Sequence, residues 1–188
     1  MTRKPKEAPA PKERIVKVAD WAAERGDAVI VTLGLGSCVA IMLHDANAGA
    51  GAMAHILLPS KSLARDVTNL AKFPETAVPL LVEQLTALGA EPRRLIAKLA
   101  GGASMFAQLM TPGSVQMGER NVAAARDVLR RTAARRSGPM RSSAARFASS
   151  GLATISIAPS SRARIAAPVP GPACALTTTT GRGVSDMM

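Results

Sequence analysis

The sequence predicts an α/β protein in which a mixed sheet packs against helices, and three observations carry this prediction. Short runs rich in Val, Ile and Ala lie at residues 28–33, 39–43 and 51–58, and turn residues separate them. Such runs are typical of buried strands. Apolar residues recur with a helical period at 75–88 and again at 121–131. The chain has 188 residues and a hydrophobic content of 47%, which suffices for one domain with a core.

The first part of the chain leads into these strands. Residues 1–13 mix Lys, Glu, Pro and Ala without periodicity, which predicts a disordered basic tail. Residues 14–24 alternate weakly and fit a strand better than a short helix; the turn signal Arg-Gly-Asp at 25–27 follows. The three apolar runs that come next are expected to pair around a glycine-rich turn at 34–37.

The middle of the chain alternates helix and strand. The helix at 75–88 is expected to end before Gly89, because glycine is favoured just beyond a helix, and Pro79 is tolerable near its start. Residues 95–100 are predicted to form a strand that runs into Gly101 and Gly102, where the backbone can take tight conformations.

The composition changes abruptly after Arg131. Residues 132–188 contain arginine but no lysine, have Asp186 as their single acidic residue, and are dominated by Ala, Ser, Thr and Pro. Only residues 152–158 resemble a strand, so this part is expected to be largely irregular or disordered. Two explanations stay open: a frameshift in GC-rich coding DNA or in its sequencing, and a divergent natural tail.

Charge and composition exclude several classes of protein. The formal net charge is +11, yet aromatic residues are 2% of the chain and Tyr is absent, so the means of stacking on nucleic-acid bases are few. Basic residues gather towards the two ends, which favours solvated ends over a nucleic-acid surface and leaves attraction to an acidic partner open.

Cysteine usage and hydropathy point to a reducing cytoplasm. Cys38 and Cys174 lie far apart and form neither a disulfide framework nor a zinc ribbon. The N-terminus lacks the apolar run of a secretory signal, and the longest uncharged stretch, 28–43, is shorter than the roughly 20 residues of a membrane span. Neither a phosphate-binding loop nor a dinucleotide fingerprint is present. We therefore expect no cofactor, no metal and no membrane-embedded segment.

Cys38 and His55 are the candidate nucleophile and base. Gly34 and Gly36 allow unusual backbone conformations, so the N–H groups around Ser37 and Cys38 could converge on a developing oxyanion. His55 could take the proton of the thiol, or pair with the thiolate and lower its pKa. An inert core cysteine and a structural buried histidine are the plainer alternatives.

A third group normally orients the imidazole of such a pair. The nearest hydroxyl on the same strand-turn unit is that of Thr32, although a spacing of six residues from Cys38 does not prove contact. His44 flanks Asp45 in an expected turn and is interpreted as a solvated loop residue.

Five ordered motifs resemble those of the chemoreceptor glutamine deamidase family, CheD. They are TLGLGSCV at 32–39, GAMAHILLP at 51–59, KFPETAVP at 72–79, AKLAGGASMF at 97–106 and GERN at 118–121. The resemblance covers residues 14–131, and the further strands with which the family normally continues are not recognisable after it.

The resemblance implies an α/β sandwich and a function. Cys38 matches the nucleophile of the family, His55 its general base, and Thr32 the residue that orients the histidine. The implied reaction is hydrolysis of selected glutamine side chains on the cytoplasmic helices of methyl-accepting chemotaxis receptors to glutamate and ammonia. Some members of the family also bind the phosphatase CheC.

Two other classes of function remain open at this stage. A CheD-like binding module that has lost activity would engage receptors or a CheC-type partner through its surface. A thiol hydrolase for another amide would use the same chemistry on a different substrate.

Overall fold

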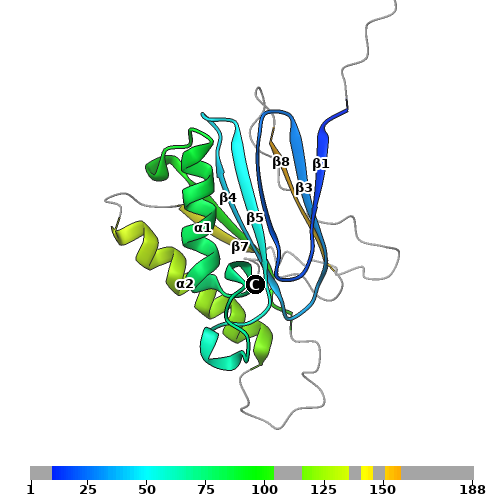
Figure 1. Ribbon diagram of the computed structural model, residues 1–188, viewed down its shortest axis with the longest axis vertical. Helices are drawn as coiled ribbons and strands as arrows, with labels where there is room; N and C mark the ends of the chain where they lie inside the picture. The colour runs from blue at the N-terminus through cyan, green and yellow to red at the C-terminus, as the bar shows by residue number, and fades with distance from the viewer. Residues whose placement is uncertain (1–9, 104–115, 136–140, 146–150, 158–188) are drawn as a thin grey trace, which may run out of the picture.

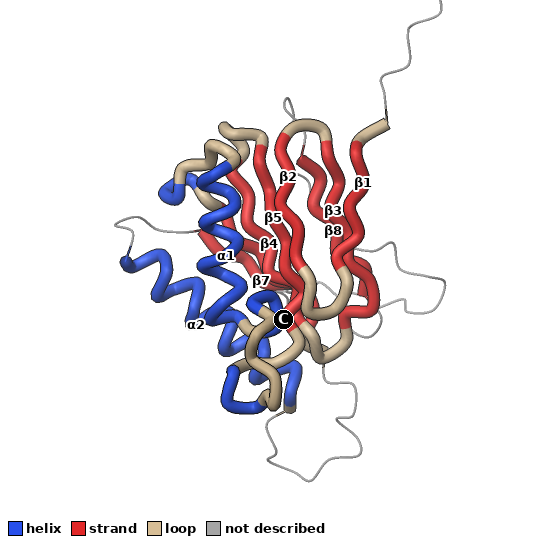
Figure 2. The backbone as a smooth tube through the Cα atoms, in the orientation of Figure 1, coloured by secondary structure: helices blue, strands red, loops and turns tan. Residues whose placement is uncertain are grey.

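The protein is arranged in three layers, which are visible in the computed structural model (Figures 1 and 2). The structure describes residues 10–103, 116–135, 141–145 and 151–157. A three-stranded sheet packs on one face of a five-stranded sheet, and two α-helices cover the other face of the five-stranded sheet. This confirms a mixed α/β architecture, with two sheets where one was expected.

The three-stranded sheet has the order β1-β3-β8. Its strands are β1 (Lys12–Val16), β3 (Ala28–Leu35) and β8 (Gly151–Ile157). β1 is parallel to β3, whereas β8 is antiparallel to it. Strand β1 starts inside the segment 1–13 for which a disordered tail was predicted; residues 1–9 lie outside the described part.

The five-stranded sheet has the order β2-β5-β4-β6-β7. All its pairs are antiparallel except β6 with β7. Its strands are β2 (Trp21–Arg25), β5 (Ala50–Ile56), β4 (Val39–Asp45), β6 (Ile96–Gly101) and β7 (Arg141–Ala145).

The single strand predicted over residues 14–24 is wrong, because the chain changes sheets there. β1 ends at Val16 and β2 begins at Trp21, and the two strands belong to different sheets. Between them Ala19 has a φ of 57°, and its N–H donates to the carbonyl of His55 at 2.8 Å. Alanine has no preference for this left-handed conformation, so the sequence carried no turn signal at this position.

The glycine-rich turn also separates the two sheets. β3 lies in the three-stranded sheet, while β4 and β5 pair in the five-stranded sheet, so the three apolar runs do not form one sheet as expected. Every residue of β4 and β5 is buried, because one face contacts the helices and the other faces the second sheet. Burial on both faces explains why these runs are continuously apolar instead of alternating.

The helix layer consists of α1 (Pro74–Ala87) and α2 (Met117–Arg135). Short 3-10 turns occur at Lys61–Leu63, Leu70–Lys72 and Pro92–Arg94. The predicted stop at Gly89 is confirmed: its φ is 87° and its N–H donates to the carbonyl of Thr86. Among the helices of the described residues, none is both long and apolar enough to span a bilayer.

Two strands come from the atypical segment 132–188. β8 agrees with the strand predicted at 152–158, whereas β7 was not predicted, because Arg-Ser-Ser-Ala-Ala has little strand preference. β7 forms through backbone pairing with the edge of β6. The residue types of β7 carry no signal for this pairing. Residues 136–140, 146–150 and 158–188 lie outside the described part, as does Cys174.

His44 is a core residue and not the solvated loop residue that was predicted. It belongs to β4, pairs with Gly51 and Ile96 on the neighbouring strands, and is only 6% exposed. Strand β4 extends two residues beyond the predicted end, and Asp45 then accepts hydrogen bonds from the backbone of Asn47. Burial, with a smaller contribution from nearby Lys98, lowers the pKa of His44.

Acid is expected to destabilise the fold, because burial also lowers the pKa of His55. Below the ordinary histidine pKa near 6.5, the histidines of the unfolded chain bind protons, whereas the buried histidines of the folded chain do not. The free energy of unfolding therefore decreases as the pH falls. Each such proton costs about 1.4 kcal/mol per pH unit. The urea midpoint should therefore drop between about pH 7.5 and about pH 5.5, and less so in His44→Gln. An unchanged midpoint in the wild-type protein would contradict the assignment of buried neutral histidines.

Candidate active site

The fold brings the three predicted catalytic residues to one end of the molecule. Cys38 is half-buried in the bend at residues 36–38, immediately before β4. His55 lies near the end of β5 and Thr32 in the middle of β3, and both side chains are fully buried. The site therefore forms where the two sheets face one another.

The strand register relates Cys38 to His55. Ala40 of β4 lies directly opposite His55 of β5. Cys38 precedes Ala40 by two residues and packs with it against the apolar cluster between the sheets. Side chains diagonal to one another across an antiparallel pair are about 7–8 Å apart at Cα, within reach of long side chains. Cys38 thus lies in the bend one residue beyond the last pair of the ladder, two positions along the chain from the residue opposite His55.

The hydroxyl of Thr32 determines which nitrogen of His55 carries the proton. Thr32 Oγ1 donates to the carbonyl of Val16 at 2.7 Å and lies 2.8 Å from His55 Nδ1. Because a hydroxyl has a single proton, and Val16 receives it, the ring nitrogen must donate to Thr32. His55 therefore carries its proton on Nδ1, and the lone pair on Nε2 is free to act as a base.

Both partners of the pair are favoured in their neutral forms. Burial lowers the pKa of His55. Burial also raises the pKa of the Cys38 thiol, which the backbone N–H of Cys38 offsets only in part. Of the two roles that the sequence allowed for His55, the geometry and these directions favour the base that accepts the thiol proton during attack over a resting thiolate–imidazolium pair.

The bend that carries Cys38 is held by three successive carbonyls. Those of Gly36 and Cys38 accept hydrogen bonds from the backbone N–H groups of Ala103 and Gly102, each at 2.8 Å. The carbonyl of Ser37 accepts a hydrogen bond from the side chain of Asn121 at 2.8 Å. These bonds fix the backbone on both sides of the nucleophile position.

Glycine is required at the entry to the bend and beside it. Gly34 has a φ of 73°, where the pairing of β3 with β8 shifts register. Gly101 has a φ of 98°, and a Cβ there would lie 2.3 Å from the carbonyl oxygen of Cys38. The backbone of β6 thus packs directly against the carbonyl group of Cys38 and leaves no room for a side chain at position 101. An oxyanion role for the amides around Gly36 and Ser37 stays a prediction.

Asn121 is the residue that sequence reasoning missed. It was noted only as part of a motif, while the structure places its fully buried side chain against the bend. A polar side chain among the apolar positions of a helix was the available signal, since buried amides normally need specific partners.

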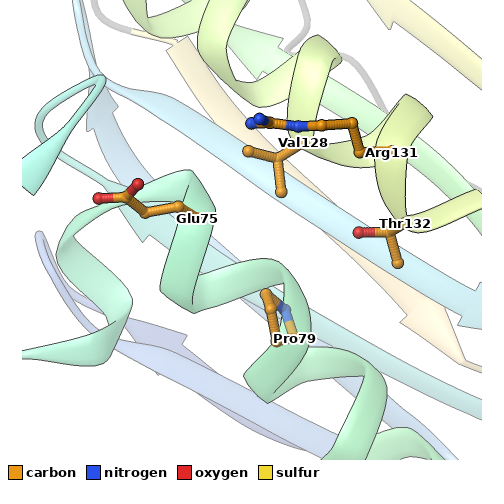
Figure 3. Close-up of a pocket in the computed structure, with 5 residues that line it drawn as sticks. All are labelled: Glu75, Pro79, Val128, Arg131 and Thr132. Atoms are coloured by element: carbon orange, nitrogen blue, oxygen red, sulfur yellow. The ribbon is translucent and has the colours of Figure 1, made fainter. Parts of the chain in front are cut away.

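A pocket between the two helices lies outside this site (Figure 3). It has a volume of about 230 Å³. The residues that line it come from α1 and α2: Glu75, Pro79, Val128, Arg131 and Thr132. Since the helices cover the face of the five-stranded sheet opposite to that of His55, this pocket does not serve the Cys38 region.

Comparison with known proteins identifies the family. Residues 57–138 match the family model described as CheD chemotactic sensory transduction. A probable chemoreceptor glutamine deamidase CheD from Caldanaerobacter subterraneus subsp. tengcongensis is 40% identical over 116 residues, covering 62% of this chain and 72% of that protein. The chain belongs to the CheD family. This confirms the family to which the five motifs pointed.

Other CheD proteins are similarly related. The chemoreceptor glutamine deamidase CheD of Thermotoga maritima is 42% identical over 118 residues, covering 63% of this chain and 71% of that protein. A probable chemoreceptor glutamine deamidase CheD of Geobacter metallireducens is 45% identical over 120 residues, covering 62% of this chain and 73% of that protein.

Thr32→Val tests the hydrogen bonds around His55 in this CheD chain. Valine keeps the shape but leaves His55 Nδ1 and the carbonyl of Val16 unpaired inside the protein. We expect a loss of about 1–3 kcal/mol in the free energy of unfolding. Any activity that depends on the Nδ1-protonated tautomer should fall about 10–100-fold. Urea unfolding measures the first effect, and the initial rate of the glutamine deamidation for which the relatives are named measures the second.

Thr86→Val is the matched control. The hydroxyl of Thr86 also donates to a backbone carbonyl, that of Val82 at 2.7 Å, but on α1. This variant should retain full activity. Equal activities for the variants at positions 32 and 86 would contradict the orienting role of Thr32.

Proposed function

We propose that this chain is a protein-glutamine deamidase that converts selected glutamines of methyl-accepting chemotaxis receptors to glutamate in the cytoplasm. Its relatives are named chemoreceptor glutamine deamidases, and the proposal extends that activity and the CheD-type α/β sandwich to this chain. The observation that carries it is the Thr32–His55 hydrogen bond, which leaves Nε2 unprotonated beside the strand that follows Cys38.

The proposed reaction runs in two halves. His55 Nε2 takes the proton of the Cys38 thiol as sulfur attacks the carboxamide carbon, and the carbonyl oxygen becomes an oxyanion. Backbone N–H groups of the turn that contains Gly34, Gly36 and Ser37 stabilise this charge. The tetrahedral intermediate expels the amide nitrogen, which receives the proton from His55 and leaves as ammonia. Water, deprotonated by His55, then hydrolyses the thioester to glutamate and the free thiol.

Neutral resting forms suit this mechanism. A lowered pKa keeps His55 unprotonated and available to accept a proton at neutral pH, and a raised pKa keeps Cys38 as a thiol until a substrate arrives. The thiol proton is then the same proton that ammonia needs on departure. Deprotonation coupled to attack avoids a thiolate buried without a counter-charge.

A protein substrate is supported by the surface around the site. Three exposed large apolar side chains lie in the stretch 57–73, which follows His55 along the chain: Leu63, Val67 and Leu70. Exposed Lys61 and Arg65 add positive charge to the stretch 57–73, beside one exposed acidic residue, Asp66. Apolar side chains with a basic rim suit a docked, acidic protein segment.

Mass spectrometry of receptor fragments tests the proposal directly. Cytoplasmic fragments of methyl-accepting receptors are incubated with the protein, and each glutamine-containing peptide is examined for the gain of about one dalton that accompanies deamidation by a thiol enzyme. The expected result is conversion at a few defined glutamines. A helical protein that is not a receptor serves as the control, and conversion of neither substrate by folded protein would overturn the proposal.

One observation favours a second candidate, a binding module without turnover. β3, which carries Thr32, pairs with β8, and β8 comes from the compositionally atypical segment 132–188. If that strand supports β3 poorly, the exposed stretch 57–73 would remain to engage receptors or a CheC-type phosphatase. Receptor binding without any glutamine conversion would support this candidate over the enzyme.

A further inference from the structure

Asn121 occupies an unusual place for an amide side chain. It lies in the second turn of α2, its exposed fraction is 0%, and its neighbours on the helix pack into the apolar core. Burying an amide is costly unless its polar atoms have partners. Among the described residues the oxygen Oδ1 of Asn121 has none, so the partners of its NH₂ group account for its place.

Both N–H groups of the amide meet backbone carbonyls. Nδ2 donates to the oxygen of Ser37 at 2.8 Å and to the oxygen of Leu57 at 3.2 Å. Since both partners are carbonyls, which can only accept, the nitrogen of the amide must face them, and the orientation of the side chain is determined. A single NH₂ group thus joins the bend before β4 to the residue just after β5.

The two carbonyls flank the candidate nucleophile and base. Ser37 immediately precedes Cys38, and Leu57 follows His55 by two residues. The ladder between β4 and β5 ends with the pair Val39 and Ile56, so both carbonyls lie beyond the last paired residues. Asn121 continues the connection between the strands where their own hydrogen bonds stop.

The site depends on this connection for a geometric reason. Cys38 lies in a bend outside the ladder, whereas His55 lies inside it and is oriented by Thr32. The backbone bonds of the bend, from Gly102 and Ala103, run to the end of β6 and beyond it and not to β5. Among the hydrogen bonds of the described residues, those of Asn121 are the ones that tie the Cys38 bend to the strand of His55.

We infer that Asn121 is a positioning residue, which sets the distance between Cys38 Sγ and His55 Nε2 by clamping the bend to the end of β5. The inference rests on the proposed function, because it assigns Asn121 to the same thiol–imidazole pair. Proton transfer between these two side chains requires a defined separation, and a displacement of about 1 Å can cost about 100-fold in rate. A role limited to anchoring α2 would leave the thiol chemistry unchanged.

The test follows the reactivity of Cys38 without any receptor. Iodoacetamide alkylation of the peptide that contains Cys38 is measured by mass spectrometry across a range of pH, in the wild-type protein and in His55→Ala and Asn121→Ala. In the wild type, His55 should accept the thiol proton during attack. Alkylation should therefore continue at pH values below the raised pKa of the thiol. We expect Asn121→Ala to lose about 10-fold of the rate at neutral pH and its profile to approach that of His55→Ala.

Two further variants separate an effect on the position of Cys38 from a general loss of protein stability. Val128→Ala removes a buried side chain from the same helix without touching Ser37 or Leu57, so it should lower the melting temperature and keep the wild-type pH profile. Asn121→Ser retains one donor and is smaller than asparagine. It takes the place of the alanine variant if that variant does not fold, and its profile should lie between wild type and His55→Ala.

The outcomes distinguish this inference from the proposed function. A shifted profile in the Asn121 variants, with the wild-type profile in Val128→Ala, supports the positioning role. A wild-type profile in the Asn121 variants, with a shifted one in His55→Ala, overturns the inference and leaves the Cys38–His55 pair intact. A wild-type profile in His55→Ala would overturn both.

Discussion

Replacing Cys38 with alanine is expected to abolish glutamine deamidation, with a loss of at least about 10⁴-fold, because the other groups of a thiol site cannot supply a nucleophile. The fold should survive, since the side chain is small, half-buried, and peripheral to the apolar cluster between the sheets. The measurement is the rate of conversion of receptor glutamines by mass spectrometry, alongside receptor binding by the same protein. Binding without conversion is the expected behaviour of this variant.

The second cysteine of the chain provides the matched control. Cys174→Ala removes the only other thiol and should retain the wild-type rate. Cys38→Ser tests whether sulfur is needed. A hydroxyl beside the same histidine is a much poorer nucleophile than a thiol. Persistent conversion by Cys38→Ala would show that the chemistry lies elsewhere in the chain.

Gly101→Ala is expected to be strongly destabilising, although it adds only a methyl group. Its Cβ would lie 2.3 Å from the carbonyl oxygen of Cys38, and the φ of 98° disfavours any side chain. Backbone strain of about 1–2 kcal/mol and overpacking of about 1–3 kcal/mol predict a total loss of about 2–5 kcal/mol. Because the clash falls on the residue before β4, the alkylation rate of Cys38 should change as well. Urea unfolding and alkylation kinetics measure both effects.

Gly26→Ala is the control that separates backbone strain from the steric clash with Cys38. Gly26 has a φ of 89°, close to that of Gly101, but nothing lies within 4 Å of a Cβ built there. It should lose only the strain component, about 1–2 kcal/mol, with normal reactivity of Cys38. Equal losses for the two glycine variants would contradict the close approach of β6 to Cys38.

The local elements of the fold were largely predictable from the sequence. The runs at 28–33 and 39–43 became β3 and β4, and the period at 75–88 became α1. Each signal is local: side-chain periodicity, strand preference, or a glycine beyond a helix. The turn at Ala19 and strand β7 escaped prediction because neither has such a signal; a hydrogen bond to β5 and pairing with β6 accompany them instead.

The candidate site was predictable in its residue types and not in its arrangement. A thiol, an imidazole and a hydroxyl at Cys38, His55 and Thr32 suggested acyl-transfer chemistry, and the motifs around them led to the CheD family. The position of the proton on His55 depends on Val16, which has no chemical signature of its own. Asn121 is 84 residues from the carbonyl it binds beside Cys38, a distance along the chain that no local pattern spans.

The sequence by itself therefore determined the chemical groups, the strands and helices that carry them, and the family. Tertiary structure alone decided that β3 and β4 lie in different sheets, so that Thr32 meets His55 across the interface between them. It also decided that Asn121 ties the bend of Cys38 to β5. The reason is physical: preferences for helix, strand and turn act between near neighbours in sequence, whereas the hydrogen bonds that orient a catalytic pair join atoms that only the packing of distant segments brings together.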